Sequence, residues 1–131
     1  MKLVRLIAVL VATIAAATVV ASPASARTRA EARAVCPDNS LCVFEHDYWN
    51  GKWVSSRSRI NNLEFFGFND KTTSYLNDSG SRFCLYEHKI TGFTSLGFRI
   101  TVNPWASTTN VGPRYNDQIT SILRSDDPFQ C

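Results

Sequence analysis

Two six-residue segments carry a dense set of oxygen-bearing side chains. Residues 69–74 read Asn-Asp-Lys-Thr-Thr-Ser, and residues 116–121 read Asn-Asp-Gln-Ile-Thr-Ser. Carboxylate, amide and hydroxyl oxygens, together with exposed backbone carbonyls, are the ligands that a hard cation such as Ca²⁺ prefers. The same residue types also build turns by hydrogen-bonding their own backbone. The pattern therefore predicts either a pair of calcium loops or a pair of structural turns.

A second duplicated pattern precedes each of these segments. Residues 44–46 (Phe-Glu-His) return as residues 86–88 (Tyr-Glu-His), 42 positions later, and a cysteine stands two positions before each copy. The Glu-His pairs invite a catalytic or zinc interpretation, but neither has the His-Glu-x-x-His spacing of a zinc protease. The sequence also contains no Gly-x-Ser-x-Gly motif and no phosphate loop. We predict a protein that is not an enzyme and that has no catalytic residues, built from a duplicated unit of about 40 residues.

The first 26 residues are expected to be a cleaved signal peptide. Lys2 and Arg5 precede an apolar stretch over residues 6–21, and residues 24–26 (Ala-Ser-Ala) form a small-x-small cleavage signal. The apolar stretch is shorter than the roughly 20 residues that span a bilayer, which argues against a retained membrane anchor. We therefore expect a secreted, extracellular protein.

Removal of the leader leaves a nearly neutral chain. The formal charge of +3 becomes +1 because Lys2 and Arg5 leave with the leader. Residues 27–35 are expected to form a flexible basic tail, and residues 36–131 a single domain with 9 Lys and Arg against 10 Asp and Glu. Such a balance predicts neither nucleic acid nor an anionic membrane as a partner. We expect a monomer.

All four cysteines follow the leader. An even count in a small secreted domain predicts two disulfides, for which four cysteines allow three connectivities. We favour Cys36–Cys42, which bridges a short Pro-Asp-Asn-Ser turn, and Cys84–Cys131, which ties the second repeat to the chain end. A zinc site is disfavoured because no two cysteines have the spacing of a structural zinc ligand set.

The rest of the sequence predicts an all-β fold. Helical periodicity is absent after the leader, and short β-rich runs alternate with Asn, Asp, Gly and Ser. Two units of about four strands each indicate a sandwich of two Greek-key motifs, over about residues 41–78 and 82–124. The predicted strands cover residues 41–46, 52–56, 74–76, 83–88, 93–100 and 119–123, with further strands within 64–68 and 101–107. The aromatic residues are expected to fill the core, the alternative being a strip that binds carbohydrate or stacks on bases. They are Phe44, Trp49, Trp53, Phe65, Phe66, Phe68, Tyr75, Phe83, Tyr86, Phe93, Phe98, Trp105 and Tyr115.

The first hairpin and the two oxygen-rich segments resemble the βγ-crystallin Greek-key motif. Phe44, Trp49 and Gly51 match its aromatic-x4-aromatic-x-Gly signature, in which the glycine adopts a positive φ that other residues resist. Both oxygen-rich segments match its (Asn/Asp)-(Asn/Asp)-x-x-(Ser/Thr)-Ser loop. The second hairpin departs from the signature, because Gly92 stands one residue early and Thr91 occupies the position of an aromatic. The resemblance implies a βγ-crystallin-like sandwich with two disulfides.

The resemblance also implies calcium sites that are each assembled from both oxygen-rich segments. One carboxylate per segment implies binding on the order of 10⁻⁴–10⁻³ M, the range of extracellular modules. The implied ligands are Asn69, Asp70, Lys71 (backbone oxygen) and Thr73 from one segment, Asn116, Asp117, Gln118 (backbone oxygen) and Thr120 from the other, and the backbone oxygens of Glu45 and Glu87.

The frame of the chain resembles a family of secreted bacterial inhibitors of thermolysin-type metalloproteinases. This frame comprises the leader, a Cys-Pro-x4-Cys opening, a two-repeat crystallin-like domain and a cysteine near the C-terminus. The resemblance implies an extracellular metalloproteinase as the partner. Such enzymes favour bulky apolar residues after the scissile bond, which suggests an inhibitory contact within residues 80–85. The alternative is that Phe83 and Leu85 are ordinary core of the second repeat. The suggested contact residues are Arg82, Phe83, Cys84 and Leu85.

Two other functions fit the same sequence. One is a secreted calcium-binding structural or stress protein, in which the oxygen-rich segments are the functional feature. The other is a small secreted antifungal toxin, a role for which the basic tail would be the supporting feature. The fold alone does not decide among them.

Overall fold

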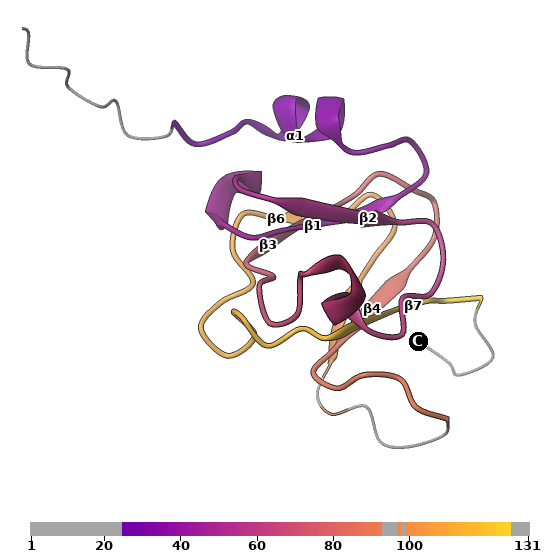
Figure 1. Ribbon diagram of the computed structural model, residues 1–131. Coiled ribbons are helices and arrows are strands. Elements are labelled where there is room, and N and C mark those ends of the chain that lie inside the picture. The colour runs from indigo at the N-terminus through magenta and orange to yellow at the C-terminus, as the bar shows by residue number, and fades with distance from the viewer. Residues whose placement is uncertain (1–24, 93–96, 98, 127–131) are drawn as a thin grey trace, which may run out of the picture.

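The computed structural model describes residues 25–92, 97 and 99–126 (Figure 1). This part of the chain contains α1 (Arg29–Val35), β1 (Leu41–Phe44), the 3₁₀ helix η1 (Asp47–Trp49), β2 (Trp53–Ser56), the 3₁₀ helix η2 (Leu63–Phe66), β3 (Ser74–Asn77), β4 (Phe83–Tyr86), β5 (Arg99–Val102), β6 (Ser107–Thr108) and β7 (Ser121–Arg124). The described residues thus form seven strands, where the sequence predicted about eight. None of the helices in these residues is long and apolar enough to cross a membrane.

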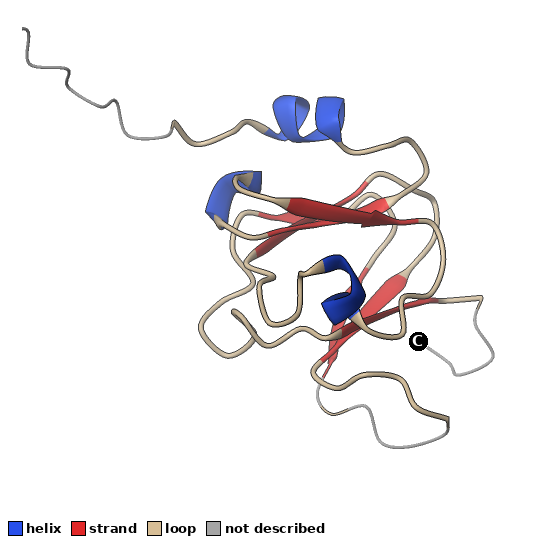
Figure 2. Ribbon diagram, viewed as in Figure 1, coloured by secondary structure: helices blue, strands red, loops and turns tan. Residues whose placement is uncertain are grey.

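The strands form two antiparallel sheets that lie one above the other (Figure 2). The first sheet has the order β2-β1-β3-β6, and the second has the order β5-β4-β7. Strand β6 comes from the second half of the sequence but pairs with β3, while Ile60 from the first half bridges to Ile122 in β7. Each half therefore completes the sheet of the other. The predicted sandwich of two Greek keys is confirmed.

The main core lies between the two sheets. Leu41 and Val43 of β1 face it, as do the equivalent Phe83 and Leu85 of β4, and all four side chains are fully buried. Successive strand residues point to opposite faces, so the residues between them lie on the outer side of each sheet. Burial of each such apolar side chain contributes about 1.5–3 kcal/mol.

The aromatic residues divide between core and surface, so the prediction that all of them fill the core is wrong. The buried ones are Phe44, Trp49, Phe68, Phe83 and Tyr86, and the large exposed ones are Tyr48, Trp53, Phe65, Phe66 and Trp105. Tyr75 and Tyr115 have intermediate burial. Phe93 and Phe98 lie outside the described residues. The molecule therefore presents aromatic surface that core packing does not explain.

The N-terminal segment is structured, so the prediction of a flexible tail over residues 27–35 is wrong. Thr28 caps α1 with a capping box: its hydroxyl accepts the Glu31 N–H at 3.2 Å, and the Glu31 carboxylate accepts the Thr28 N–H at 2.6 Å. The Thr28 backbone bond, followed by its side-chain bond, lowers the pKa of Glu31. The Thr-x-x-Glu signature of this helix is legible in the sequence, and the prediction overlooked it.

Helix α1 covers the outer face of the first sheet (Figure 1). Ala32 is fully buried in a cluster that includes Phe44 of β1 and Leu76 of β3. Arg33 forms an ion pair with the buried Asp78, with 2.8 Å between Nη2 and Oδ1. These contacts explain why a helix of seven residues, too short to be stable in isolation, is present on the domain.

The Cys36–Cys42 disulfide joins the end of α1 to β1 and confirms the first predicted pair, with 5.9 Å between the two Cα atoms. The second predicted pair, Cys84–Cys131, stays a prediction because Cys131 lies outside the described residues.

The second hairpin uses a different glycine from the one that the sequence suggested. Gly51 has φ +76° and lies against Glu45 and His46, and a Cβ placed there would meet His46 Cδ2 at 2.7 Å. Gly97 has φ +79° and lies in the same way against Glu87 and His88, whereas nothing lies within 4 Å of the Cβ position at Gly92. The second hairpin is therefore four residues longer than the first, and Gly97 rather than Gly92 is the equivalent of Gly51.

Candidate functional site

The two oxygen-rich segments lie beside each other and exchange backbone hydrogen bonds. The Asp70 N–H donates to the Ile119 carbonyl at 3.1 Å, and the Asp117 N–H donates to the Thr72 carbonyl at 3.2 Å. Because these two bonds join equivalent positions of the repeats, the pairing is close to two-fold symmetric. The structure thus brings together two segments that lie 47 positions apart in the sequence.

Each segment turns sharply at its aspartate. Asp70 has φ +52° and Asp117 has φ +54°, a left-handed conformation that aspartate tolerates better than most residues. The preceding asparagine side chain donates to the aspartate carboxylate in both copies, at 2.7 Å for Asn69 and 2.9 Å for Asn116. The turn geometry places both carboxylates at the surface, where both are exposed.

The Thr-Ser ends of the segments fix the strand ends that carry the Glu-His pairs. The Ser74 hydroxyl donates to the His46 carbonyl, and the Ser121 hydroxyl donates to the His88 carbonyl, both at 2.6 Å. The Thr73 hydroxyl donates to the Glu45 carbonyl at 2.8 Å. The Glu-His pairs therefore serve the fold through their backbone oxygens.

Two surface hollows flank the paired segments. The first is lined by residues that include Glu45, Thr73, Asn116 and Asp117. The second is lined by residues that include Asn69, Asp70, Glu87, Gln118 and Thr120. Each hollow combines residues from both segments with the glutamate that directly follows the first strand of a repeat, Glu45 after β1 or Glu87 after β4.

The donors around the hollows suit a hard cation. Within the residues that the structure describes, no three side chains of His, Cys, Asp and Glu are grouped so that they could hold a metal ion, so a ligand set at the hollows would have to include other oxygens. Most oxygens at the hollows are neutral amide, hydroxyl and carbonyl groups, which suit Ca²⁺ far better than Zn²⁺. The buried Oδ1 atom of Asn116 has no hydrogen-bond partner among the described residues, so one amide oxygen at the first hollow is available to a ligand.

The two hollows differ in their local charge. At the first, the Lys71 ammonium lies 3.9 Å from the Glu45 carboxylate. The second repeat has the neutral Gln118 at the position of Lys71. At the second hollow, the Thr120 hydroxyl donates to the Asp70 carboxylate at 3.3 Å, a contact between side chains of the two repeats.

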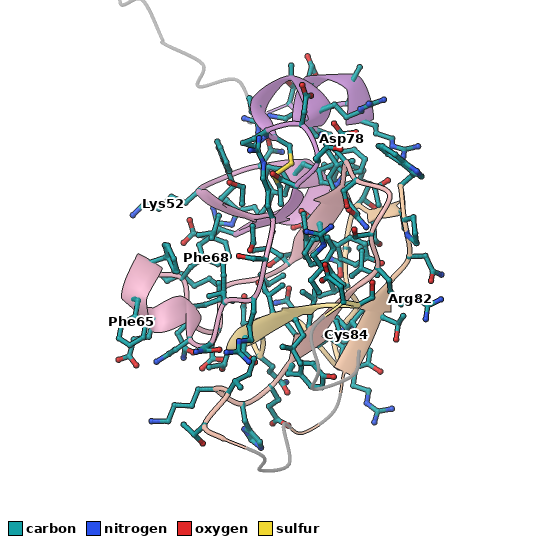
Figure 3. The ribbon with its side chains drawn as sticks, turned by 90° about the vertical axis from the view of Figure 1, so that its right-hand side faces the viewer. Lys52, Phe65, Phe68, Asp78, Arg82 and Cys84 are labelled. Carbon is teal, nitrogen blue, oxygen red and sulfur yellow. A yellow bond between two sulfur atoms is a disulfide. The ribbon has the colours of Figure 1, made fainter. Side chains whose placement is uncertain are left out.

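The predicted inhibitory contact does not lie on an accessible loop. Phe83, Cys84 and Leu85 belong to β4, the central strand of the second sheet, and each has 0% of its surface exposed. Figure 3 shows Cys84 inside the molecule and Arg82 at its edge. Of the four residues only Arg82 is exposed. Phe83 and Leu85 are therefore core residues, as the alternative interpretation had it, because both side chains pack in the cluster between the two sheets.

The stretch 64–68, predicted as a strand, contains the 3₁₀ helix η2 instead. Asn62 accepts the Glu64 N–H at 3.0 Å and caps its start, and Gly67 ends it in a left-handed conformation. The Asn and Gly that flank the apolar run were the local signals for this turn.

The paired Greek keys and the loops that join them define a βγ-crystallin-like domain, and solved structures agree. One structure that concerns the evolution of the eye-lens βγ-crystallin domain fold is 16% identical, covers 68% of this chain and 88% of its own, and has a TM-score of 0.60. A βγ-crystallin from Ciona intestinalis is 21% identical over 65% of this chain and 98% of its own, with a TM-score of 0.53. The N-terminal domain of protein S is 26% identical over 65% of this chain and 93% of its own, with a TM-score of 0.54.

Residues 29–92 match the model of peptidase inhibitor family I36. The match begins at the first residue of α1 and runs through the first Greek key into the second hairpin. A search of curated proteins found no significant match. The chain thus has a βγ-crystallin-like fold, and this fold and the match to a peptidase inhibitor family point to a protein that is not an enzyme.

Proposed function

We propose that this chain is a secreted, monomeric inhibitor of thermolysin-type metalloproteinases. The observation that carries the proposal is the match of residues 29–92 to a peptidase inhibitor family. The Cys-Pro-x4-Cys opening, whose cysteines form a disulfide, and the paired Greek keys support the narrower target class, since they are the frame that such inhibitors share with this chain.

The construction of the domain suits an inhibitor. A disulfide, the exchange of β6 and Ile60 between the halves, and the capped helix α1 hold the chain in one conformation. A surface that is already rigid loses little conformational entropy when it binds a protease cleft. Rigidity also disfavours cleavage, because a protease needs a substrate that adapts to its active site.

Titration of the purified, oxidised protein against two proteases tests the proposal. Residual activity of a thermolysin-type metalloproteinase is expected to fall linearly and to reach zero near one inhibitor per enzyme. A serine protease of the trypsin class, assayed in parallel, is expected to keep its activity. Loss of activity in neither enzyme, or in the serine protease alone, would contradict the proposal.

Secretion is proposed from the leader and is supported by the disulfide, which forms and persists in oxidising compartments. Mass spectrometry of the protein recovered from the medium of an expressing bacterium is expected to show a chain that begins at Arg27. A cell-associated chain that still begins at Met1 would contradict it.

Calcium binding at the two hollows is a second proposed function, favoured by the cross-repeat arrangement of their oxygens. Asn69, Asp70, Gln118, Thr120 and Glu87 would hold one ion, and the equivalent residues of the other repeat would hold the second. A bound ion would supply a charge cross-link between the two repeats, which stabilises the fold by mass action. Calorimetry of a chelated sample is expected to show heat and a rise in melting temperature at about 10 mM Ca²⁺. An unchanged melting temperature and no heat would remove the sites.

A further inference from the structure

We propose that Phe65 and Phe66, on the 3₁₀ helix η2, are the residues that enter the active-site cleft of the metalloproteinase partner. The proposal rests on the proposed function and adds the contact surface to it. This contact replaces the one that the sequence suggested in β4. The apolar side chains of β4 are buried, whereas Phe65 and Phe66 of η2 are exposed.

These two side chains form the most exposed aromatic surface of the described residues. Phe65 has 83% of its surface exposed and Phe66 has 58%, against 53% for the next aromatic residue, Trp105. Figure 3 shows Phe65 projecting from the edge of the molecule, on the side opposite Arg82. Two adjacent large apolar side chains in water lower solubility and add nothing to the core. A partner surface that covers them accounts for their position.

The backbone beneath the pair is fixed at both ends. Leu63, fully buried, donates its N–H to the Thr120 carbonyl at 2.7 Å, and Phe68, 2% exposed, donates its N–H to the Leu63 carbonyl at 3.0 Å. The Gly67 N–H donates to the Glu64 carbonyl at 2.9 Å. The two phenylalanines therefore stand on a short convex turn whose flanking residues are anchored in the core. Such an anchor enters a pocket without an ordering cost for the loop.

The chemistry of η2 fits the cleft of a metalloproteinase in two respects. A large aromatic side chain that becomes fully desolvated in a pocket is the usual energetic centre of an interface. Glu64 places an exposed carboxylate directly before the pair, where the Asn62 amide donates to it at 3.3 Å. Negative charge beside the anchor complements a cleft that holds a Zn²⁺ ion, and carboxylate oxygen is a natural zinc ligand.

A double variant, Phe65→Ser with Phe66→Ser, tests the proposal against a thermolysin-type metalloproteinase. We expect its inhibition constant to rise by about 30-fold or more, the effect of removing a central aromatic anchor. Trp105→Asn is the matched control, because Trp105 is also more than half exposed but lies on the loop that contacts α1 through Arg29. The control is expected to inhibit as the unsubstituted protein does. Both variants should melt within a few degrees of it, since all three side chains are largely outside the core.

A Glu64→Gln variant tests the contribution of the Glu64 charge separately from that of the apolar contact. This variant keeps the size of the side chain and is expected to slow association with the metalloproteinase and to flatten its dependence on salt. An unchanged salt dependence would remove the electrostatic part of the proposal.

The outcomes distinguish this inference from the function on which it rests. If the unsubstituted protein does not inhibit the metalloproteinase, the proposed function and the inference both fail. If it inhibits and the folded double variant inhibits equally well, only the inference fails. If sedimentation shows a dimer that the double variant abolishes while inhibition is unchanged, the pair serves a second copy of the chain, and the inference is overturned.

Discussion

Replacement of Gly97 by alanine should destabilise the domain more than replacement of Gly92. Both glycines lie in the second hairpin with left-handed φ, +79° and +65° respectively. They differ in their surroundings. A Cβ at Gly97 would lie 2.9 Å from Glu87 Oε2, 3.1 Å from Glu87 Cβ and 3.1 Å from His88 Cδ2, whereas a Cβ at Gly92 would meet nothing within 4 Å.

The expected loss of stability in each variant is the sum of two free-energy costs, backbone strain and overpacking. A left-handed alanine costs about 1 kcal/mol more than glycine, and this cost applies to both variants. The Glu87 carboxylate can move aside, but its Cβ is held by the backbone directly after β4. Gly97→Ala therefore adds an overpacking cost of about 1–3 kcal/mol. Because 1 kcal/mol shifts the melting temperature of a domain of this size by about 4–8 °C, Gly92→Ala should lower it by about that amount. Gly97→Ala should lower it at least about twice as far.

Thermal unfolding followed by near-ultraviolet circular dichroism measures both variants. Gly51→Ala in the first hairpin serves as the reference, because its Cβ would crowd Glu45 and His46 in the same way. Gly51→Ala and Gly97→Ala should be alike, with Gly92→Ala the mildest of the three. If Gly92→Ala destabilises as much as Gly97→Ala, the assignment of Gly97 as the equivalent of Gly51 is refuted.

Three further perturbations follow from the same structure. Leu85→Ala should cost about 3 kcal/mol in urea unfolding, because Leu85 is fully buried between the sheets; a cost below 1 kcal/mol would contradict its place in the core. Lys71→Gln should tighten calcium binding about 2- to 5-fold in calorimetry by removing the cation beside Glu45, and weaker binding would refute the assignment of the first hollow. Burial raises the pKa of Tyr75, so stability is fully present below about pH 10 and declines as the pH rises through the raised folded value. Tyr75→Phe should remove that part of the alkaline decline in urea unfolding, and an identical decline in both proteins would exclude Tyr75 as its source.

The N-terminal segment and η2 show what kind of information the sequence lacked. The capping box of Thr28 and Glu31 is a local motif, so the start of the helix can be predicted from the sequence. The position of the helix on the domain depends on the ion pair of Arg33 with Asp78, which joins residues 45 positions apart. Phe65 was assigned to the core because it is apolar. Its exposure depends on the cap at Asn62, which turns the chain so that Leu63 rather than Phe65 faces inward.

The hairpin glycine shows the same limit. The spacing of the motif suggested Gly92, because Gly92 lies nearest to the expected position. The hairpin needs its glycine where the backbone passes close to a glutamate and a histidine, and that position is Gly97. The second hairpin loop is four residues longer than the first, and no local sequence motif indicates this extra length. Only the pairing of Tyr86 with Arg99, which matches that of Phe44 with Trp53, reveals the register.

The sequence by itself determined the duplicated Greek key, the Cys36–Cys42 disulfide and the resemblance to an inhibitor family. These depend on residues whose chemistry acts over short distances: a turn, an alternating strand, a pair of nearby cysteines. The tertiary structure decided which surfaces are available. It buried Phe83 and Leu85 between the two sheets, exposed Phe65 and Phe66 on a fixed turn, and placed Asp70 against Ile119 of the other repeat. Exposure and the meeting of distant segments depend on how all the elements pack together, which no single segment encodes.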